Sequence, residues 1–353
     1  MLAGGVFGYL ADYALWWVLY LSLLVHTWCF FRFFPRRKRR KLGLAMGNGL
    51  VFICMLGFAA LAAESYFRFV CVETDPFGWS LPAQRWFALH ARLNSLGCRD
   101  VEWSVKKPSG VRRIAFVGDS FTYGWGIEDV GNRFSDRVGA MFDRASPGTV
   151  QVMNVAKAGW DTGAQLQPIK DMIAIYGVDE VVLCYVANDI EELLPKTDDF
   201  NPVHPPQRRW FNPDSSCLVD YLYRRIWMPR APTVRGYHDW LAEGFADSEV
   251  RRRHCDQLGA IIRHCRDQGV TIRAVLLPFI LTRGEKFQPT SVHAMLRRFF
   301  EAGQVAVLDL LPTIAGEDPA DLVVNGHDAH PNEQANELFA EAIWNAFYAT
   351  AAP

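Results

Sequence analysis

The chain has 353 residues, half of them apolar, which is enough for one large or two ordinary domains with a substantial core. The formal net charge of -1 hides an asymmetry, because residues 1–70 carry eight Lys or Arg against two acids while the rest is mildly acidic. That acidic part has no basic stripe with interleaved aromatics, so binding to nucleic acid is not expected. Eight cysteines in a chain of this length do not make a disulfide scaffold.

Two apolar runs open the chain, over residues 6–31 and 42–63, and each is near the roughly 20 residues that span a bilayer core. Between them lies RFFPRRKRRK, and short loops this rich in Arg and Lys stay on the cytoplasmic side. We therefore predict a two-helix transmembrane hairpin over residues 1–70, with both chain ends facing outward. A signal peptide would carry its basic region before the apolar run, whereas no Lys or Arg precedes Arg32.

Asp12 and His26 interrupt the first apolar run. Ionisable groups inside a span often face a protein interior, although either residue would also fit at the membrane interface. The basic loop is interpreted as a topology determinant rather than as a lipid or nucleic-acid site. Two spans exceed what anchoring in the lipid bilayer requires, which leaves room for docking against another membrane protein.

Residues 71–110 are expected to form a linker that packs on the following domain, because Pro and Gly interrupt any long periodic element there. Residues 111–353 are expected to form the main domain. Short apolar strands are predicted at residues 113–117, 150–155, 180–186, 270–278 and 305–310, and helices at 133–144, 162–176, 250–267, 291–302 and 332–348. Continuously apolar strands that alternate with helices predict a parallel sheet covered on both faces, as a flavodoxin-like three-layer α/β/α sandwich.

An insertion at about residues 191–245 is the least regular part of this domain. Since it follows a strand, it either shapes substrate access or is a surface excursion. In the helix after it, His254-Cys255 and His264-Cys265 lie about 1000° apart on the helical wheel and so do not share a face. We expect no metal site there.

The strongest chemical signal is FVGDSFTYG, in which Gly118, Asp119 and Ser120 turn away from the first strand. A Ser just past the carboxyl end of a strand projects its hydroxyl into the crevice where open α/β sheets bind ligands. Its own backbone N–H then points toward an adjacent oxyanion. Gly-Asp-Ser by itself is equally compatible with a tight turn, so the other strand ends must decide.

Three further segments follow predicted strands, namely NVAKAGWDTG, YVANDI and NGHDAHPNEQA. With FVGDSFTYG they resemble, in the same order, the motif blocks of the SGNH (GDSL-like) hydrolase family. NSLGCRDVEW also resembles a segment that often precedes the nucleophile in bacterial membrane-anchored members. The resemblance covers nearly everything from Leu93 to the C-terminus apart from the insertion, and it implies the SGNH hydrolase fold.

By this resemblance Ser120 corresponds to the nucleophile, His330 to the catalytic base and Asp328 to its acid. Gly159 and Asn188 correspond to residues that form the oxyanion hole together with the backbone N–H of Ser120. His330 would take the proton from Ser120 during attack on an ester carbonyl and return it to the leaving alcohol, while Asp328 orients the imidazole. This chemistry needs no cofactor and no metal.

One departure concerns the acid. The commonest family pattern separates acid and histidine by two residues, whereas Ala329 alone separates Asp328 from His330. An Asp-X-His pair is similar to that of membrane-linked polysaccharide O-acetyltransferases, which favours acyl transfer to a glycan. His327 is a minor alternative for the base. An ordinary α/β-hydrolase is disfavoured, because the segment around Ser120 is not Gly-X-Ser-X-Gly and follows the first strand.

The sequence thus predicts a serine esterase or O-acyltransferase acting on acetyl or short-chain acyl esters of an extracytoplasmic carbohydrate, such as an O-acetylated polysaccharide. Lipase and thioesterase activities share this chemistry and stay open. So does a non-catalytic role as partner of a multispanning membrane acyltransferase. The sequence does not decide between hydrolysis and transfer, nor whether Cys71 and Cys98 form a disulfide.

Overall fold

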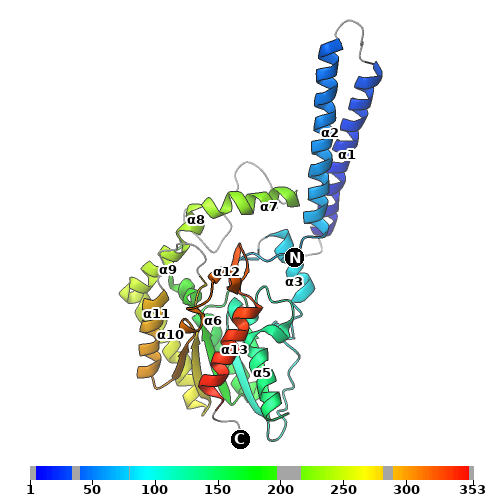
Figure 1. Ribbon diagram of the computed structural model, residues 1–353. Coiled ribbons are helices and arrows are strands. Elements are labelled where there is room, and N and C mark those ends of the chain that lie inside the picture. Colours follow the sequence, from blue (N-terminus) through cyan, green and yellow to red (C-terminus); the bar gives the residue numbers. More distant parts are fainter. Residues whose placement is uncertain (1–4, 34–39, 79, 197–215, 281–288, 350–353) are drawn as a thin grey trace. The chain divides into compact units, whose positions relative to one another are not determined.

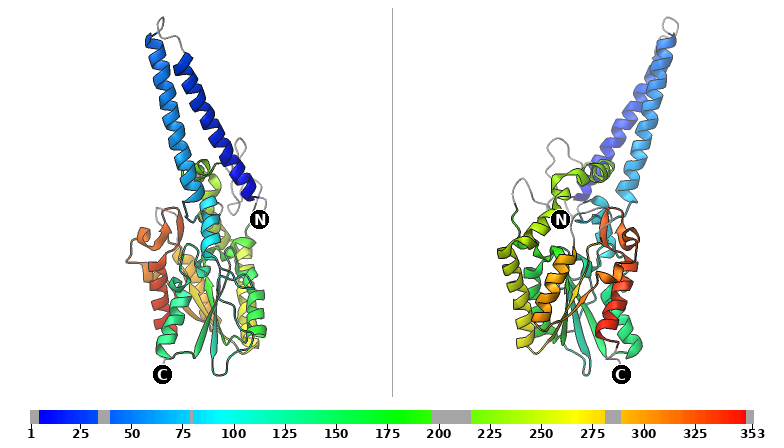
Figure 2. Two further views of the ribbon diagram at one scale, coloured as in Figure 1. Left: turned by 90° about the vertical axis from the view of Figure 1, so that its right-hand side faces the viewer. Right: turned by 60° about the vertical axis from the view of Figure 1, so that its left-hand side comes forward.

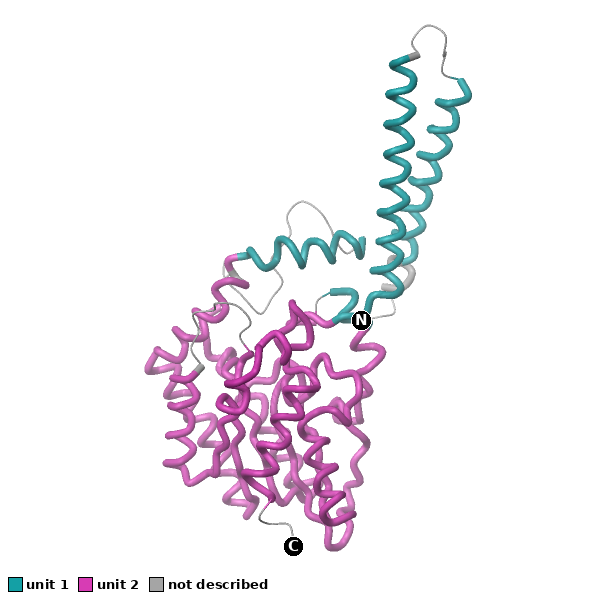
Figure 3. Tube along the Cα trace, in the orientation of Figure 1, with its two compact units in different colours: residues 1–73, 79–85, 205–231 teal, residues 74–78, 86–204, 232–353 magenta. Residues whose placement is uncertain are grey.

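The computed structural model describes residues 5–33, 40–78, 80–196, 216–280 and 289–349, and it divides into two compact units (Figures 1 and 3). The first unit comprises residues 1–73, 79–85 and 205–231, and the second comprises residues 74–78, 86–204 and 232–353. These units do not follow the predicted domain boundaries. Most of the expected linker belongs to the second unit, and part of the insertion belongs to the first. Sequence periodicity does not show which unit a connecting segment packs on.

The first unit is built on two long helices, α1 (Gly5–Phe33) and α2 (Arg40–Phe69). Both are long and apolar enough to cross a membrane, over Leu10–Phe33 and Lys41–Phe69. Most of the predicted basic loop, residues 34–39, lies outside the described residues.

The two helices pack against each other in antiparallel fashion. Tyr13 Oη lies 2.7 Å from Ser65 Oγ at one end, and Thr27 Oγ1 lies 3.3 Å from Cys54 Sγ further along. His26 contacts the backbone oxygen of Ser22 in its own helix at 2.6 Å. The structure therefore gives His26 a local partner, and Asp12 is half-buried.

A buried carboxylate joins α2 to helix α7 (Cys217–Ile226) of the insertion. Glu64 accepts hydrogen bonds from Ser216 Oγ at 2.7 Å and from the backbone N–H of Cys217 and Leu218 at 3.0 and 2.9 Å. Arg68, one turn along α2, donates to the same carboxylate at 2.7 Å. A negative charge at the first N–H groups of a helix stabilises that helix, so Glu64 holds α7 against the end of α2.

The second unit contains the predicted parallel sheet. Its strands are β1 (Arg112–Gly118), β2 (Val150–Ala156), β3 (Glu180–Tyr185), β4 (Thr271–Leu276) and β5 (Ala306–Asp309). They pair in the order β2-β1-β3-β4-β5, with every pair parallel. This is the order of a flavodoxin-like sheet, so the predicted fold class is confirmed.

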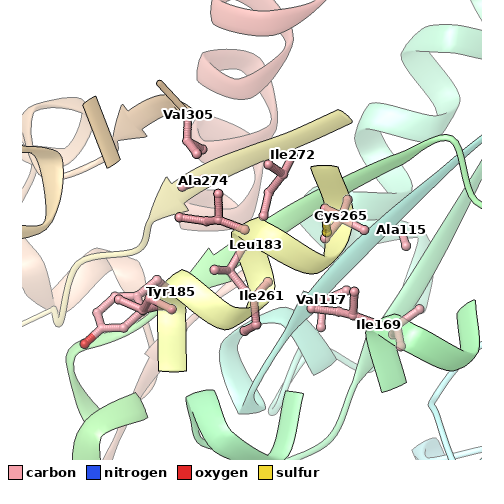
Figure 4. Packing of buried hydrophobic residues seen from close by; sticks show 14 of the residues in the cluster. Ala115, Val117, Ile169, Leu183, Tyr185, Ile261, Cys265, Ile272, Ala274 and Val305 are labelled. Carbon is pink, nitrogen blue, oxygen red and sulfur yellow. The ribbon is translucent and has the colours of Figure 1, made fainter. Parts of the chain in front are cut away.

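Helices cover both faces of this sheet (Figure 2). They are α5 (Phe134–Ala145) and α13 (Glu333–Phe347) on one face, and α6 (Thr162–Tyr176), α10 (Ser248–Asp267) and α11 (Pro289–Ala302) on the other. Alternate strand residues face opposite layers: Ile114 and Phe116 pack with α5 and α13, while Ala115 and Val117 pack with α6 and α10. Figure 4 shows the second of these cores.

Several short elements were not predicted. In the first half they are α3 (Leu81–His90), α4 (Ser120–Tyr123), η1 (Val130–Asn132) and η2 (Ala187–Leu193). The insertion, expected to be irregular, contains α7, η4 (Met228–Arg230), α8 (Pro232–Arg235) and α9 (Tyr237–Ala246), and its residues 197–215 lie outside the described residues. After β5 come η5 (Pro312–Ile314), α12 (Pro319–Leu322), and the antiparallel hairpin of β6 (Val323–Asn325) with β7 (Asp328–Pro331). Elements this short leave little periodicity to detect.

Candidate active site

The carboxyl ends of three adjacent strands meet at one level of the sheet. Gly118, the last residue of β1, aligns with Ala156 at the end of β2 and with Cys184 near the end of β3. The loops after these strands carry three of the predicted site residues. The strand register, set by the parallel pairing, therefore brings sequence-distant motifs to one edge of the sheet.

The turn after β1 presents Ser120 at the start of the one-turn helix α4. Asp119 caps this helix, accepting a hydrogen bond from the backbone N–H of Phe121 at 2.9 Å. Asp119 is fully buried, whereas Ser120 is half-exposed. Gly118 is required by space, because a Cβ there would lie 2.2 Å from Thr122 Oγ1 and 2.8 Å from the Cys184 carbonyl. The turn therefore fixes its backbone tightly and leaves the serine hydroxyl accessible.

Ser120, His330 and Asp328 form a continuous hydrogen-bonded chain. His330 Nε2 lies 2.8 Å from Ser120 Oγ, and His330 Nδ1 lies 2.5 Å from Asp328 Oδ1. Asp328 also accepts from the backbone N–H of His330 at 3.2 Å. A serine, a histidine and a carboxylate in this geometry are able to perform nucleophilic acyl transfer.

Strand β7 accounts for the short spacing between acid and histidine. Residues two apart in a strand project to the same face, so Asp328 and His330 are both buried while Ala329 between them is exposed. The sequence placed these residues only between the last predicted strand and the C-terminal helix, and strand β7 itself was not predicted. His327, the alternative base, is exposed and makes only a backbone hydrogen bond to Asn325 Oδ1 in the described part of the chain.

The two predicted oxyanion-hole partners differ in their surroundings. Asn188, in η2 after β3, donates from Nδ2 to Asp119 Oδ2 at 3.0 Å, which places its amide beside the Ser120 turn. Gly159 lies in the loop after β2 with a φ of 78°, a conformation that favours glycine. Open space surrounds its missing Cβ, and within the described residues no hydrogen bond joins Gly159 to the Ser120 chain.

Comparison with known families decides the assignment. The model of the GDSL-like lipase/acylhydrolase family matches residues 116–338, which is more than half of the chain. The chain belongs to this family. Its members are ester hydrolases, and the fold is that of SGNH hydrolases. Among the curated proteins, none matches the chain.

Solved structures that are similar to the chain include several hydrolases. One is a member of the lipolytic G-D-S-L family from Veillonella parvula, with 16% identity, 68% of this chain and 100% of that chain covered, and a TM-score of 0.42. The psychrotrophic esterase EstA from Pseudoalteromonas has 13% identity, coverages of 69% and 100%, and a TM-score of 0.41. A catalytic mutant of an acetylxylan esterase from Geobacillus stearothermophilus has 14% identity, coverages of 68% and 96%, and a TM-score of 0.42.

In this GDSL-like hydrolase, nearby charges shift the pKa values of His330 and Asp328. Burial lowers the pKa of His330, but the negative charge and hydrogen bond of Asp328, with smaller contributions from Asp119 and Asp75, outweigh burial and raise it above 6.5. For Asp328, burial raises the pKa, and the attraction of His330 together with the hydrogen bonds that His330 donates lowers it by more. The pair is therefore arranged so that the carboxylate stays ionised and supports a positive imidazolium.

Three other carboxylic acids, on the loops that follow β1, β2 and β3, have raised pKa values. Burial raises the pKa of Asp119 despite its hydrogen bonds with Asn188 and Phe121. Burial also raises the pKa of Asp161 to about 6, with Glu192 adding to the shift. Burial raises that of Glu191 to about 7, although Tyr237 and Lys196 act against it. This part of the hydrolase therefore holds two acids, Asp161 and Glu191, whose pKa values lie close to neutral pH.

Two buried arginines that were not predicted from the sequence support the loop that follows Ser120. Arg99 donates to the carbonyls of Gly124 at 2.8 Å and Ile127 at 2.6 Å, just beyond α4. Arg133 donates to the carbonyls of Arg99 and Tyr123, and its guanidinium is also paired with Asp136. Arg99 belongs to NSLGCRDVEW, so the resemblance of that segment was the available signal.

Aromatic rings enclose His330 in the hydrolase. The Phe121 ring centroid lies 5.1 Å from that of His330, and the Trp125 ring centroid lies 6.2 Å away. Both aromatic residues are less than a tenth exposed. They lie next to the imidazole of His330, which is itself only 7% exposed.

In the described part of the chain, no group of three or more His, Cys, Asp or Glu is arranged to hold a metal ion. His254, of the first His-Cys pair, is buried on α10 with its Nε2 2.9 Å from Tyr185 Oη. Burial lowers the pKa of His254 to about 4. This histidine is thus part of the core beneath the sheet.

Proposed function

We propose that this chain is a serine-dependent esterase or O-acyltransferase with Ser120 as nucleophile, His330 as general base and Asp328 as acid. The observation that carries the proposal is the hydrogen-bonded chain from Ser120 Oγ through both ring nitrogens of His330 to Asp328 Oδ1. Family membership supports ester chemistry, and the raised pKa of His330 fits a group that must hold a proton during the reaction.

In the proposed mechanism, His330 Nε2 accepts the proton of Ser120 Oγ as this oxygen attacks the ester carbonyl. The tetrahedral oxyanion is held by the backbone N–H groups of Ser120 and Gly159 and by the Asn188 amide. The imidazolium returns the proton to the leaving alcohol and leaves an acyl-serine. Water or a sugar hydroxyl then loses its proton to His330 and attacks the acyl group, which releases free acid or a new ester.

The acyl group is proposed to be acetyl or another short chain. The acceptor or leaving alcohol is proposed to belong to an extracytoplasmic carbohydrate, in particular an O-acetylated polysaccharide. This substrate class is supported by the Asp-X-His spacing and by the expected outward orientation of the catalytic unit.

The proposed location is the plasma membrane, with α1 and α2 as spans and the catalytic unit outside the cytoplasm. Support comes from the length and hydropathy of the two helices and from the dense basic run between them. A second span suits docking to a multispanning membrane acyltransferase, which would act as a partner in acyl transfer.

The test uses the full-length protein purified in detergent, assayed with p-nitrophenyl esters of increasing acyl length. Wild type should cleave the acetyl ester fastest, and Ser120→Ala should lower kcat by a factor on the order of 10⁴–10⁶. A fluorophosphonate probe should label wild type and not the variant. Equal esterase activity in both proteins would overturn the proposal.

A second assay separates hydrolysis from transfer. An O-acetylated glycan is incubated with the enzyme and an unacetylated acceptor glycan, and free acetate is measured against acetylated acceptor. Acetate alone supports an esterase, and acetylated acceptor supports a transferase. A stable membrane partner that co-purifies with a chain that the probe does not label would instead support a non-catalytic partner.

A further inference from the structure

The catalytic unit includes a short piece of chain that follows the two membrane helices. Residues Thr74–Gly78 cluster with the second unit, although α2 ends only at Phe69. Thr74 is 4% exposed. Its carbonyl accepts a hydrogen bond from Asn325 Nδ2 at 3.2 Å, and Asn325 is the strand partner of Asp328 in the β6–β7 hairpin. Thr74 thus lies against the hairpin that carries the proposed acid.

A second contact holds the same segment against a ring that lies beside the imidazole. Trp125 Nε1 donates to the Asp75 carbonyl at 3.0 Å, and the Trp125 ring lies beside His330. Gly78 has a φ of 69° and approaches Trp125 so closely that a Cβ would lie 2.9 Å from the ring. The position of Thr74 is therefore determined by backbone contacts that do not involve its own hydroxyl.

Two complementary polar atoms remain without a partner at this place. Asp328 Oδ1 receives both hydrogen bonds from His330, whereas Asp328 Oδ2 is buried and has no partner in the described part of the chain. Thr74 Oγ1 is buried and unpartnered as well. A buried carboxylate oxygen without a donor is costly, and a threonine hydroxyl rotates its hydrogen toward a nearby acceptor.

We propose that the Thr74 hydroxyl donates a hydrogen bond to Asp328 Oδ2 and acts as a positioning residue for the acid of the proposed triad. The inference rests on the proposed function. The bond holds the carboxylate plane so that Oδ1 stays on His330 Nδ1, which fixes the imidazole with Nε2 toward Ser120. A hydrogen bond from the Thr74 hydroxyl also lowers the pKa of Asp328, which keeps the carboxylate ionised.

The consequence is that residues just beyond the membrane helices complete the active site. A fragment that begins at residue 111, where the sequence suggested that the domain starts, lacks Thr74. The segment brings a donor to Asp328 from a distant part of the chain. The orientation of the Asp328 carboxylate therefore depends on residues that directly follow α2.

The test compares full-length wild type, Thr74→Val and Thr74→Ser in detergent with p-nitrophenyl acetate. Thr74→Val removes the hydroxyl and keeps the branched shape, and should lower kcat/KM about 10- to 100-fold, mainly in kcat. The acid limb of its pH profile, which His330 sets, should move to higher pH, because a carboxylate that has lost a donor stabilises the imidazolium more strongly. Thr74→Ser keeps the hydroxyl and should restore both the rate and the profile.

A folded Thr74→Val with the wild-type rate and pH profile would overturn the inference, as would a Thr74→Ser variant as slow as Thr74→Val. If Thr74→Val melts below the assay temperature, Thr74→Ala serves the same comparison, since the backbone contacts of residue 74 do not need the side chain. Activity that does not depend on Ser120 would instead overturn the proposed function, so the two failures are distinguishable.

Discussion

Three carboxylates act on His330 and set its proton affinity. Burial lowers the pKa of this histidine, but Asp328, bound at 2.5 Å, raises it by more, and Asp119 and Asp75 add to the effect from further away. A general base must be neutral to accept a proton. If His330 is the proposed base, its raised pKa places the switch from inactive imidazolium to active imidazole above the ordinary pKa of a histidine.

We predict that kcat/KM rises with pH through an apparent pKa above 6.5. Asp328→Asn should lower kcat by about 10⁴-fold and move this limb to lower pH, because the histidine loses its nearest negative charge. His327→Ala, which changes an exposed neighbour, should keep the wild-type profile. The measurement is kcat/KM across the acid and neutral range. A wild-type limb that does not lie at higher pH than that of Asp328→Asn would contradict this assignment.

At the scale of elements, the β6–β7 hairpin holds Asp328 and His330 in a fixed relative orientation, which an irregular loop would do less well. Period-two alternation in β7 directs Asp328 and His330 to the same buried face, and the pairing of Asn325 with Asp328 holds the strand in place. The one-residue spacing is thus a property of a strand. The register of the strand, rather than the number of intervening residues as such, brings acid and base together.

Insertion of one glycine between Ala329 and His330 should abolish activity to nearly the extent of Ser120→Ala. The insertion restores the two-residue spacing common in the family, yet in a strand it turns the acid and the base to opposite faces. Ala329→Ser is the matched control, because this position is exposed and should tolerate a hydroxyl. Esterase assays on folded proteins decide the point. Near-wild-type activity in the insertion variant would show that the strand register is not what aligns the pair.

At the scale of the whole chain, the two units interleave along the sequence. Residues 74–78 belong to the catalytic unit, while 79–85 and 205–231 belong to the unit of the long helices. The buried Glu64 carboxylate binds α7 of the insertion to α2 within that unit. Residues 205–231 of the insertion therefore belong to the helical unit, whereas the rest of the insertion belongs to the other unit.

Reporter fusions should show both ends of the chain outside the cytoplasm. The basic run between the helices stays inside, because Lys and Arg in short loops resist translocation. A C-terminal alkaline phosphatase fusion should be active and a C-terminal green fluorescent protein fusion dark. Fusions made after Arg40, at the start of α2, should show the reverse pattern. A bright C-terminal fluorescent fusion would contradict the proposed orientation.

Local sequence determined the order and nature of most elements in the catalytic unit. The buried run Val181–Leu183 reads as a central strand because both of its faces are covered, and Gly177 follows α6 in a left-handed conformation that ends the helix. The motif residues Ser120 and Asn188 follow their strands as expected. These features depend on neighbours within a few residues, so composition and periodicity record them.

Only the tertiary structure decided how distant polar residues meet. The contacts of Thr74 with the Asp328 hairpin and of Glu64 with the start of α7 join parts of the chain that no local pattern relates. The short β6–β7 hairpin likewise depends on pairing and packing rather than on periodicity. Thus the sequence by itself determined the parallel α/β fold and the candidate triad, and the folded chain decided which buried groups hold that triad, because burial and hydrogen bonding act across space.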